Sequence, residues 1–363
     1  MKRALIAFSA LLALVATVAP VATARPASGP PLDAAKPATY AIIGDTPYGT
    51  PQVENFPTDV AEINADPDVS LVMHLGDIKN GSSACSTNYF EQVRADFDRF
   101  EDPFVYTPGD NEWTDCHRAN NGAYWPAGPV LNGDSRPARL DEVHRIFFDR
   151  PGWTLGKNPR QVETQGGDYV ENVAWTQSRT EFGTLDVPGS NNDWAPWFEQ
   201  PRTSSQIAEV EGRTVSDLDW LDHLFGRARE DNAKAVVVGI QADMWDQAIV
   251  SNPDSYDHFT PIVQELAKQT ADFGGPVLLL NGDSHQFIDD RPLADPSRPQ
   301  NLSIYGLEEE VPNLQRITVN GSTTPCHEWL KLTVSPSASH PFAYQRVEFA
   351  KQPGFDPSVC PGR

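Results

Sequence analysis

The sequence predicts an α/β fold with strands buried on both faces and helices between them. Four apolar runs without alternation end in the dipeptide Gly-Asp, and such runs suit strands that are covered on both sides. Helical spacing of apolar residues separates several of these strands, which indicates right-handed crossovers and a largely parallel sheet. Other segments are typical of antiparallel strands, and we expect them to form a second sheet packed on the first.

Most of the candidate functional residues lie at the ends of the Gly-Asp strands. The apolar runs are 40–43, 71–75, 104–108 and 277–281, and their aspartates are Asp45, Asp77, Asp110 and Asp283. A fifth run, 236–240, ends at Gln241 with Asp243 beside it, and His285 follows Asp283 by two residues. In open α/β sheets, ligands bind outside the carboxyl ends of the strands. Carboxylates gathered there repel one another unless a cation lies among them, so the pattern predicts a metal site at this edge.

Between the strands, apolar residues recur at spacings of three and four. The expected helices cover about 90–100, 140–147, 216–229 and 260–273. Ser216, with Asp219 three residues later, is suited to begin the third helix, and Pro261 and Gly274 bound the fourth.

The second sheet is expected from segments that read as antiparallel strands. These are 169–175, 180–187, 315–319, 329–334 and 342–349. Two loops rich in Pro and Asn, 120–137 and 188–201, are long enough to be functional.

The first residues predict export. Lys2-Arg3 precedes an uncharged apolar stretch, 4–18, and the small residues before Arg25 suit a secretory signal peptide cleaved after Ala24. The stretch is shorter than the ~20 residues of a spanning helix, so no stable membrane anchor is expected. We therefore expect a secreted protein, with the signal peptide at 1–24, a Pro/Ala-rich linker at 25–37 and one domain at 38–363.

Cysteine usage and charge agree with an exported protein. Four cysteines allow three pairings, and we expect Cys85–Cys116, which would join two loops of the predicted edge, and Cys326–Cys360. The formal net charge of −22 disfavours nucleic acid as a partner. An anionic substrate would need locally placed cations, in practice metal ions.

The order of these motifs resembles the calcineurin-like metallophosphoesterase superfamily over about 39–287. The motifs of that superfamily run D-x-H, G-D, G-N-H-[DE], a His after an apolar strand, and G-H-x-H. The resemblance implies a four-layer α/β/β/α sandwich of two mixed sheets flanked by helices. It also implies a binuclear site, where two cations clamp a phosphoryl group and lower the pKa of a bridging water, which yields hydroxide for in-line attack.

The resemblance assigns roles to individual residues. The implied metal ligands are Asp45, Asp77, Asp110, Gln241, Asp283 and His285, with Asp243 as the alternative to Gln241 at the fourth motif. Asp77 takes the position of the ligand that bridges both metals, and Asn111 takes the place of the histidine that contacts phosphate. The chain also departs from the pattern, because the family's other histidine positions hold Pro47, Asn111, Gln241 and Asp283. Such an oxygen-rich set suits harder ions, and two divalent ions (Mn, Mg, Ca, Fe or Zn) are expected.

Three further side chains near the motifs are candidates for other roles. Lys79 is positioned in the chain to meet substrate phosphate, although a surface lysine would look the same. His117 is a candidate acid for the leaving group, because Asn111 cannot donate a proton as a histidine does; the alternative is a loop histidine without a role. His74 is expected to be a buried strand residue and not a ligand.

These features predict a secreted, metal-dependent phosphoesterase that acts on phosphate mono- or diesters of a phosphorylated small molecule. The alternative is an exported, non-catalytic metal- or ligand-binding protein on the same fold, and metal content separates the two. An aspartyl-phosphate mechanism at Asp45 is disfavoured because Pro47 stands where that chemistry needs a second Asp. The sequence contains no G-x-S-x-G, P-loop or G-x-G-x-x-G motif.

Overall fold

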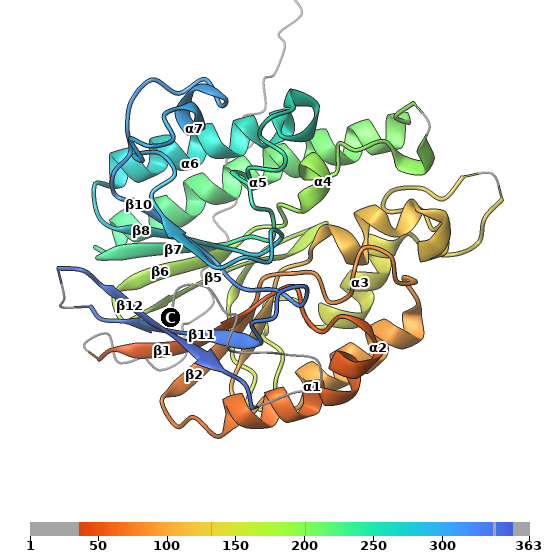
Figure 1. Ribbon diagram of the computed structural model, residues 1–363, viewed down its shortest axis with the longest axis horizontal. Coiled ribbons are helices and arrows are strands. Elements are labelled where there is room, and N and C mark those ends of the chain that lie inside the picture. Colours follow the sequence, from red (N-terminus) through yellow and green to blue (C-terminus); the bar gives the residue numbers. More distant parts are fainter. Residues whose placement is uncertain (1–35, 132, 200, 337–338, 351–363) are drawn as a thin grey trace, which may run out of the picture. The chain divides into compact units, whose positions relative to one another are not determined.

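Two β-sheets with helices on their outer faces make up the part of the chain that the computed structural model describes, residues 36–131, 133–199, 201–336 and 339–350 (Figure 1). The predicted signal peptide, and the predicted linker up to residue 35, lie outside these ranges.

The first sheet has five strands in the order β12-β11-β1-β2-β3. Its bounds are β1 Ala38–Ile43, β2 Val69–His74, β3 Phe104–Tyr106, β11 Glu328–Val334 and β12 Phe342–Glu348. The three Gly-Asp strands β1, β2 and β3 are parallel to one another, and β11 and β12 add antiparallel pairs on the side of β1. Both faces of β1 and β3 are buried, as their unbroken apolar runs predict.

The second sheet has seven strands in the order β4-β5-β6-β7-β8-β10-β9. Its bounds are β4 Glu163–Gly166, β5 Tyr169–Gln177, β6 Thr180–Thr184, β7 Ala235–Gly239, β8 Val277–Asn281, β9 Ile288–Asp290 and β10 Leu314–Thr318. The central strands β6, β7, β8 and β10 are parallel, and antiparallel strands flank them at both sides.

The assignment of strands to sheets differs from the expectation. We expected all the Gly-Asp strands in one sheet and the antiparallel segments in the other, and this was wrong. The structure places β8 with β7 in the second sheet, while β11 and β12 join the first. Strand β10, expected to be antiparallel, pairs in parallel with β8. An apolar run reports that a strand is buried on both faces, but it does not report which strand lies beside it.

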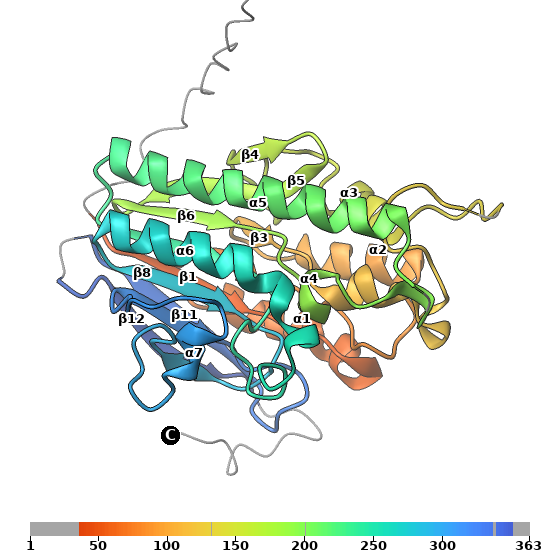
Figure 2. The same cartoon turned by 90° about the horizontal axis from the view of Figure 1, so that it is seen from above.

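Helices cover the outer face of each sheet (Figures 1 and 2). The seven-stranded sheet carries α5 Ser204–Glu230 and α6 Thr260–Phe273, which share an apolar core with β7 and β8. The five-stranded sheet carries α1 Gly49–Asn64, α2 Thr87–Phe97 and α3 Arg139–Phe147. The short helices α4 Gly189–Asn192 and α7 Gln300–Ser303 lie in loops.

Two helices differ from the sequence expectation. Helix α5 begins at Ser204 and not at Ser216, because the side chain of Thr203 caps it by accepting a hydrogen bond from Gln206 N at 3.1 Å. Helix α1 was not expected, since it is polar and contains Pro57. Its buried stripe is narrow, and the sequence around it offers few apolar residues at helical spacing.

The inner faces of the two sheets pack against each other. Tyr40 and Leu71 of the first sheet share one apolar cluster with Phe182 and Leu278 of the second, and all four are at most 1 % exposed. This contact brings the carboxyl ends of β1, β2 and β3 next to those of β7 and β8, where the candidate site lies.

Candidate metal centre

Four aspartates from both sheets converge at this edge, and we call them the edge cluster: Asp45, Asp77, Asp110 and Asp283. The backbone N–H of Asp283 donates to both carboxylate oxygens of Asp45 at 3.0 Å, which joins the two sheets. Ligand atoms of Asp77, Asp110 and Asp283 all lie within 4.8 Å of one another. The predicted convergence of these carboxylates is therefore observed.

The turns that carry these side chains have an uncommon backbone. Asp45, Asp77 and Asp283 have φ values of 51°, 59° and 70°, and His285 has a φ of 62°. Non-glycine residues rarely adopt this left-handed conformation, which costs about 1–2 kcal/mol each and clusters at functional sites. The strand ends thus hold the carboxylates in an orientation that a relaxed turn does not give.

Glycines beside the aspartates permit the close approach. A Cβ atom built on Gly282 would lie closer than 3.0 Å to the carboxylate of Asp45, and one built on Gly109 would meet that of Asp77 equally closely. Glycine is therefore required at both positions by space, in addition to its use in the turn.

The edge cluster is strongly electronegative. Asp45 is fully buried, Asp77 is 2 % exposed and Asp110 is 8 % exposed. Burial raises the pKa of Asp45, Asp77 and Asp283 well above the usual range, and the neighbouring carboxylates raise it further. No lysine or arginine in the described ranges forms an ion pair with these four aspartates, and the nearest basic ring is His285, with Nε2 3.5 Å from Asp45 Oδ1.

This arrangement fits a divalent metal ion. Buried carboxylates without a basic partner need protons or a cation, and oxygen atoms within 4.8 Å of one another can share one ion. The chain therefore contains a cluster, Asp77, Asp110 and Asp283, that can hold a metal.

Gln241 and Asp243, the two candidates at the end of β7, have different partners. Gln241 belongs to the edge, because its Nε2 donates to Asp110 Oδ1 at 3.3 Å and its Oε1 accepts from Gly189 N at 2.5 Å. Asp243 instead forms a buried ion pair with Arg316, which Asp290 also contacts.

Asn111 faces the predicted bridging ligand. Its Nδ2 donates to Asp77 Oδ2 at 2.5 Å and to the Tyr48 hydroxyl at 3.1 Å. The same Tyr48 hydroxyl donates to Asp77 Oδ2 at 3.0 Å. Asp77, Asn111 and Tyr48 thus form one polar group within the site.

Lys79 is buried and not on the surface. It is 1 % exposed, and its Nζ donates to the backbone oxygen of Asn111 at 2.6 Å. Burial lowers the pKa of Lys79, while Glu112 and Asp77 oppose that shift. The ammonium group therefore supports the loop that carries Asn111.

His117 is engaged with the loop 188–201. Its Nδ1 accepts a hydrogen bond from Phe198 N at 2.9 Å, and the two rings meet edge to face. Burial lowers the pKa of His117 to about 4, and the charge of Arg118 adds to the shift. The imidazole is therefore neutral at pH 7.

His285, which follows β8, and His74, in β2, have different surroundings. His285 lies at the edge, where Tyr48 contacts its ring and burial lowers its pKa to about 4. His74 is fully buried in β2, and its Nε2 lies 2.8 Å from Thr46 O, away from the edge cluster. His74 is thus a buried strand residue, as expected.

Glu112 was not singled out from the sequence. Its Oε1 accepts from the Tyr106 hydroxyl at 2.6 Å, from Gly109 N at 2.7 Å and from Asp77 N at 3.0 Å. One buried carboxylate therefore ties the ends of β2 and β3 together beneath the edge cluster. Its place directly after Asp110-Asn111 was the available signal.

Ser190 was also missed. Its hydroxyl lies 2.8 Å from Asp110 Oδ2 and 3.1 Å from Asp115 Oδ1. Ser190 lies in a run of four left-handed residues that ends at Asp193. A Cβ atom on the preceding Gly189 would lie 2.8 Å from Asp110 Oδ2. The sequence indicated only that this loop is long.

The predicted disulfide Cys85–Cys116 is present, with a Cα–Cα distance of 5.8 Å. It joins the loop after β2 to the segment that carries His117, and both sulfur atoms lie near the backbone oxygen of Asn111. Cys360, the expected partner of Cys326, lies outside the described residues.

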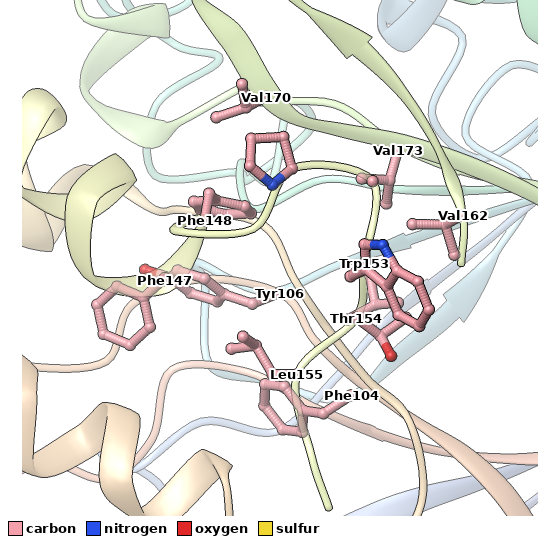
Figure 3. Close-up of a pocket in the computed structure, with 13 residues that line it drawn as sticks. Phe104, Tyr106, Phe147, Phe148, Trp153, Thr154, Leu155, Val162, Val170 and Val173 are labelled. Carbon is pink, nitrogen blue, oxygen red and sulfur yellow. The ribbon is translucent and has the colours of Figure 1, made fainter. Parts of the chain in front are cut away.

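A pocket away from the edge cluster is mostly apolar. It encloses about 350 Å³, including space open to solvent, between β3, the segment 147–155 and β5 (Figure 3). Its lining residues include Phe104, Phe148, Trp153, Leu155, Val162 and Val173. No aspartate, glutamate or histidine lines it, so it offers no ligand to a metal ion.

Within the described residues, we find no helix long and apolar enough to cross a membrane.

Comparisons with known proteins add little. No family model matches the chain, and no curated protein matches it. Among solved structures, the chain is similar to GAP50, described as the anchor in the inner membrane complex of Plasmodium. The TM-score is 0.38 at 11 % identity, and the alignment covers 89 % of this chain and 92 % of that one. At this TM-score the similarity supports no inference about fold or function.

Proposed function

We propose that this protein is a secreted, metal-dependent phosphoesterase on a four-layer α/β/β/α sandwich of the calcineurin-like metallophosphoesterase type. One observation carries the proposal: Asp77, Asp110 and Asp283, from the ends of β2, β3 and β8, have ligand atoms within 4.8 Å of one another. Asp77 and Asp110 are buried and Asp283 is half-buried, and none of the three has a lysine or arginine ion-pair partner in the described ranges. The motif order supports the phosphoesterase assignment, and the disulfide Cys85–Cys116 supports export.

Two divalent ions would be held by Asp45, Asp77, Asp110, Asp283 and His285, with Gln241 at the periphery. When bound, such ions lower the pKa of a coordinated water and neutralise charge on a phosphoryl group. The protein side chains supply positioning. Asn111 and Tyr48 both donate to Asp77 Oδ2, and either would have to release one of its present hydrogen bonds to donate to a phosphoryl oxygen. Lys79, through Asn111 O, keeps that loop in place.

The substrate class we propose is a phosphorylated small molecule. The net charge of −22 disfavours a polyanion such as nucleic acid over the surface as a whole.

A second candidate function is metal or ligand binding without catalysis. The observation that favours it is the state of His117, which is neutral at pH 7 and uses its Nδ1 to accept from Phe198 N, so it lacks the extra proton that an acid for the leaving group would supply.

Elemental analysis of the purified mature protein, with assays on nitrophenyl phosphate and bis-nitrophenyl phosphate, tests the proposal. We expect about two metal ions per chain and hydrolysis that a chelator abolishes. Bound metal without hydrolysis of either ester would favour the binding protein. Absence of bound metal after incubation with each of the five expected ions would exclude the metal-dependent phosphoesterase and would leave only the binding of another ligand.

A further inference from the structure

A group of buried hydrogen-bond donors lies on the inner side of β1 and β5, and no acceptor in the described ranges serves it. Arg160 Nε and Nη2, the Tyr40 hydroxyl and Trp175 Nε1 are all shielded from solvent and have no hydrogen-bond partner in the described ranges. Tyr40 is fully buried and Trp175 is 4 % exposed. We call these three residues the donor cluster.

The three donors are neighbours. The Arg160 guanidinium lies 5.6 Å from the centre of the Trp175 ring. Burial raises the pKa of Tyr40, and the charge of Arg160 and the Trp175 indole oppose that rise. The rings of Tyr40 and Trp175 also pack on Phe182, with centroid distances of 4.8 Å and 5.1 Å.

The donor cluster carries a positive charge that no carboxylate balances. Arg160 Nη1 donates to Gln177 Oε1 at 3.0 Å, and no carboxylate in the described part of the chain forms an ion pair with Arg160. Burial lowers the pKa of Arg160. An arginine stays protonated even so, and a buried charge without a partner is strongly unfavourable. A site with one cation, additional O–H and N–H donors and no anion therefore favours an anionic ligand.

The arrangement of the unpartnered atoms Arg160 Nε and Nη2 indicates which chemical class of ligand the donor cluster can bind. Nε and Nη2 form one edge of the guanidinium, and that edge pairs with both oxygens of a carboxylate in parallel. A carboxylate also has further lone pairs, which a phenol O–H and an indole N–H can use. Its single negative charge matches the single positive charge of Arg160. We propose that the donor cluster binds the carboxylate group of a small organic acid.

This site is separate from the edge cluster. Tyr40 precedes Asp45 by five residues, which corresponds to about 16 Å along an extended chain. Arg160 instead adjoins the apolar pocket of Figure 3, because its backbone N donates to the Oγ1 of Thr154, a residue of that pocket, at 3.0 Å. Arg160 as a residue is partly exposed, but its Nε and Nη2 atoms are shielded from solvent, so a ligand reaches them only when the neighbouring side chains move.

The test is a titration of the metal-free full-length mature protein with sodium acetate in the presence of a chelator. Sodium chloride at equal ionic strength serves as the reference, and calorimetry and the thermal unfolding midpoint are the readouts. The chelator removes metal from the proposed phosphoesterase site, so failure of that function does not affect the result. We expect saturable acetate binding and a rise in the midpoint that follows the same dissociation constant.

Two variants and a control make the test specific. Arg160→Gln should weaken acetate binding at least tenfold. Tyr40→Phe, which removes one oxygen from the packed core and keeps the ring, should weaken it about threefold to tenfold. Arg179→Gln, at an exposed arginine in the turn between β5 and β6, should bind acetate as the wild type does. If Arg160→Gln does not fold, Tyr40→Phe decides.

A structural readout completes the experiment. Crystals grown with bromoacetate should show the anomalous signal of bromine beside Arg160. The proposal is overturned if the wild type shows no saturable acetate binding, or if the Tyr40→Phe and Arg160→Gln proteins bind acetate as tightly as the wild type.

Discussion

Two clusters of buried carboxylates in this molecule differ in whether cationic side chains balance their charge. The edge cluster has no arginine or lysine partner in the described ranges. The second, which we call the α5 cluster, combines Glu171, Asp186 and Asp217 with Arg213. Arg213 is fully buried and donates to the backbone oxygen of Asp186 at 3.0 Å, and His144 Nε2 lies 2.8 Å from Glu171 Oε2. The α5 cluster therefore contains cations of its own.

The backbone separates the two clusters as clearly as the charge does. Asp45, Asp77 and Asp283 have left-handed φ values, whereas Glu171, Asp186 and Asp217 do not. The compensation in the α5 cluster is incomplete, since both carboxylate oxygens of Asp186 lack a hydrogen-bond partner and burial raises its pKa. A buried aspartate alone therefore does not indicate a metal ligand. A strained strand end, crowded by glycine and without a resident cation, is the more specific indication.

The largest expected effect is that of Asp77→Asn. An amide cannot bridge two cations with matching charge, so metal content should fall and hydrolysis should decrease by at least about 10³-fold, or about 4 kcal/mol of transition-state stabilisation. Asp217→Asn makes the same chemical change in the α5 cluster, and it should leave metal content unchanged. Elemental analysis and ester hydrolysis measure both. Wild-type activity in Asp77→Asn would undo the binuclear hypothesis, and metal loss in Asp217→Asn would remove the distinction between the clusters.

Arg213→Met should lower the free energy of unfolding. Without the guanidinium, the carboxylates of the α5 cluster lose their main buried counter-charge, and removing one partner of a buried pair costs about 3–5 kcal/mol of the free energy of unfolding. Urea unfolding measures this loss, and metal content should stay at the wild-type level. A loss below about 1 kcal/mol would mean that protons, and not Arg213, balance these carboxylates.

Much of the site could be predicted from the sequence because the end of a buried strand indicates which residues lie at the carboxyl edge of the sheet. A buried run followed by Gly-Asp places a carboxylate at the carboxyl edge, and this held for Asp45, Asp77, Asp110 and Asp283. Local pairing also placed Cys85 beside Cys116. These inferences needed only strand direction and chain proximity.

Residues that enter the site from distant segments could not be predicted. Ser190 reaches Asp110 across 80 residues of chain through a left-handed turn, for which the local sequence Gly189-Ser190 gives no specific signal. Lys79 was expected either to meet substrate phosphate or to lie on the surface, and its burial could not be predicted because it depends on the loop of Asn111. Sheet membership was also beyond reach, since β8 and β2 have similar apolar patterns but pair in different sheets.

The pH dependence of stability should distinguish the α5 cluster from the edge. Burial is the largest single effect on His144 and opposes its protonation, but the charge of Glu171, a hydrogen bond to Glu171 and the charges of Asp141 and Asp168 together outweigh it and raise the pKa of His144 above its usual value. A raised pKa means that the folded state binds the proton more tightly, so this contribution is fully present below about pH 6.5, the unfolded value, and is lost as pH rises through the folded value.

His144→Gln removes that contribution. Urea unfolding of the metal-free protein from pH 5.5 to 8.5 should show that the wild type loses more stability with rising pH than His144→Gln does. Parallel pH profiles for the two proteins would contradict the proposed His144–Glu171 pairing.

The smallest expected effect is that of His117→Ala. His117 was the candidate acid for the leaving group, and loss of a true acid would reduce hydrolysis of esters with poor leaving groups by about 10²-fold or more while sparing nitrophenyl esters. The structure gives the imidazole a different partner, because its Nδ1 accepts from Phe198 N, and burial lowers its pKa to about 4. We therefore expect a loss of about threefold or less, equal for both kinds of ester, from looser packing of the loop 188–201. Rates for phenyl phosphate and nitrophenyl phosphate, compared between His117→Ala and the wild type, decide this. A selective loss on phenyl phosphate would restore the acid role and would require His117 to leave Phe198 when substrate binds.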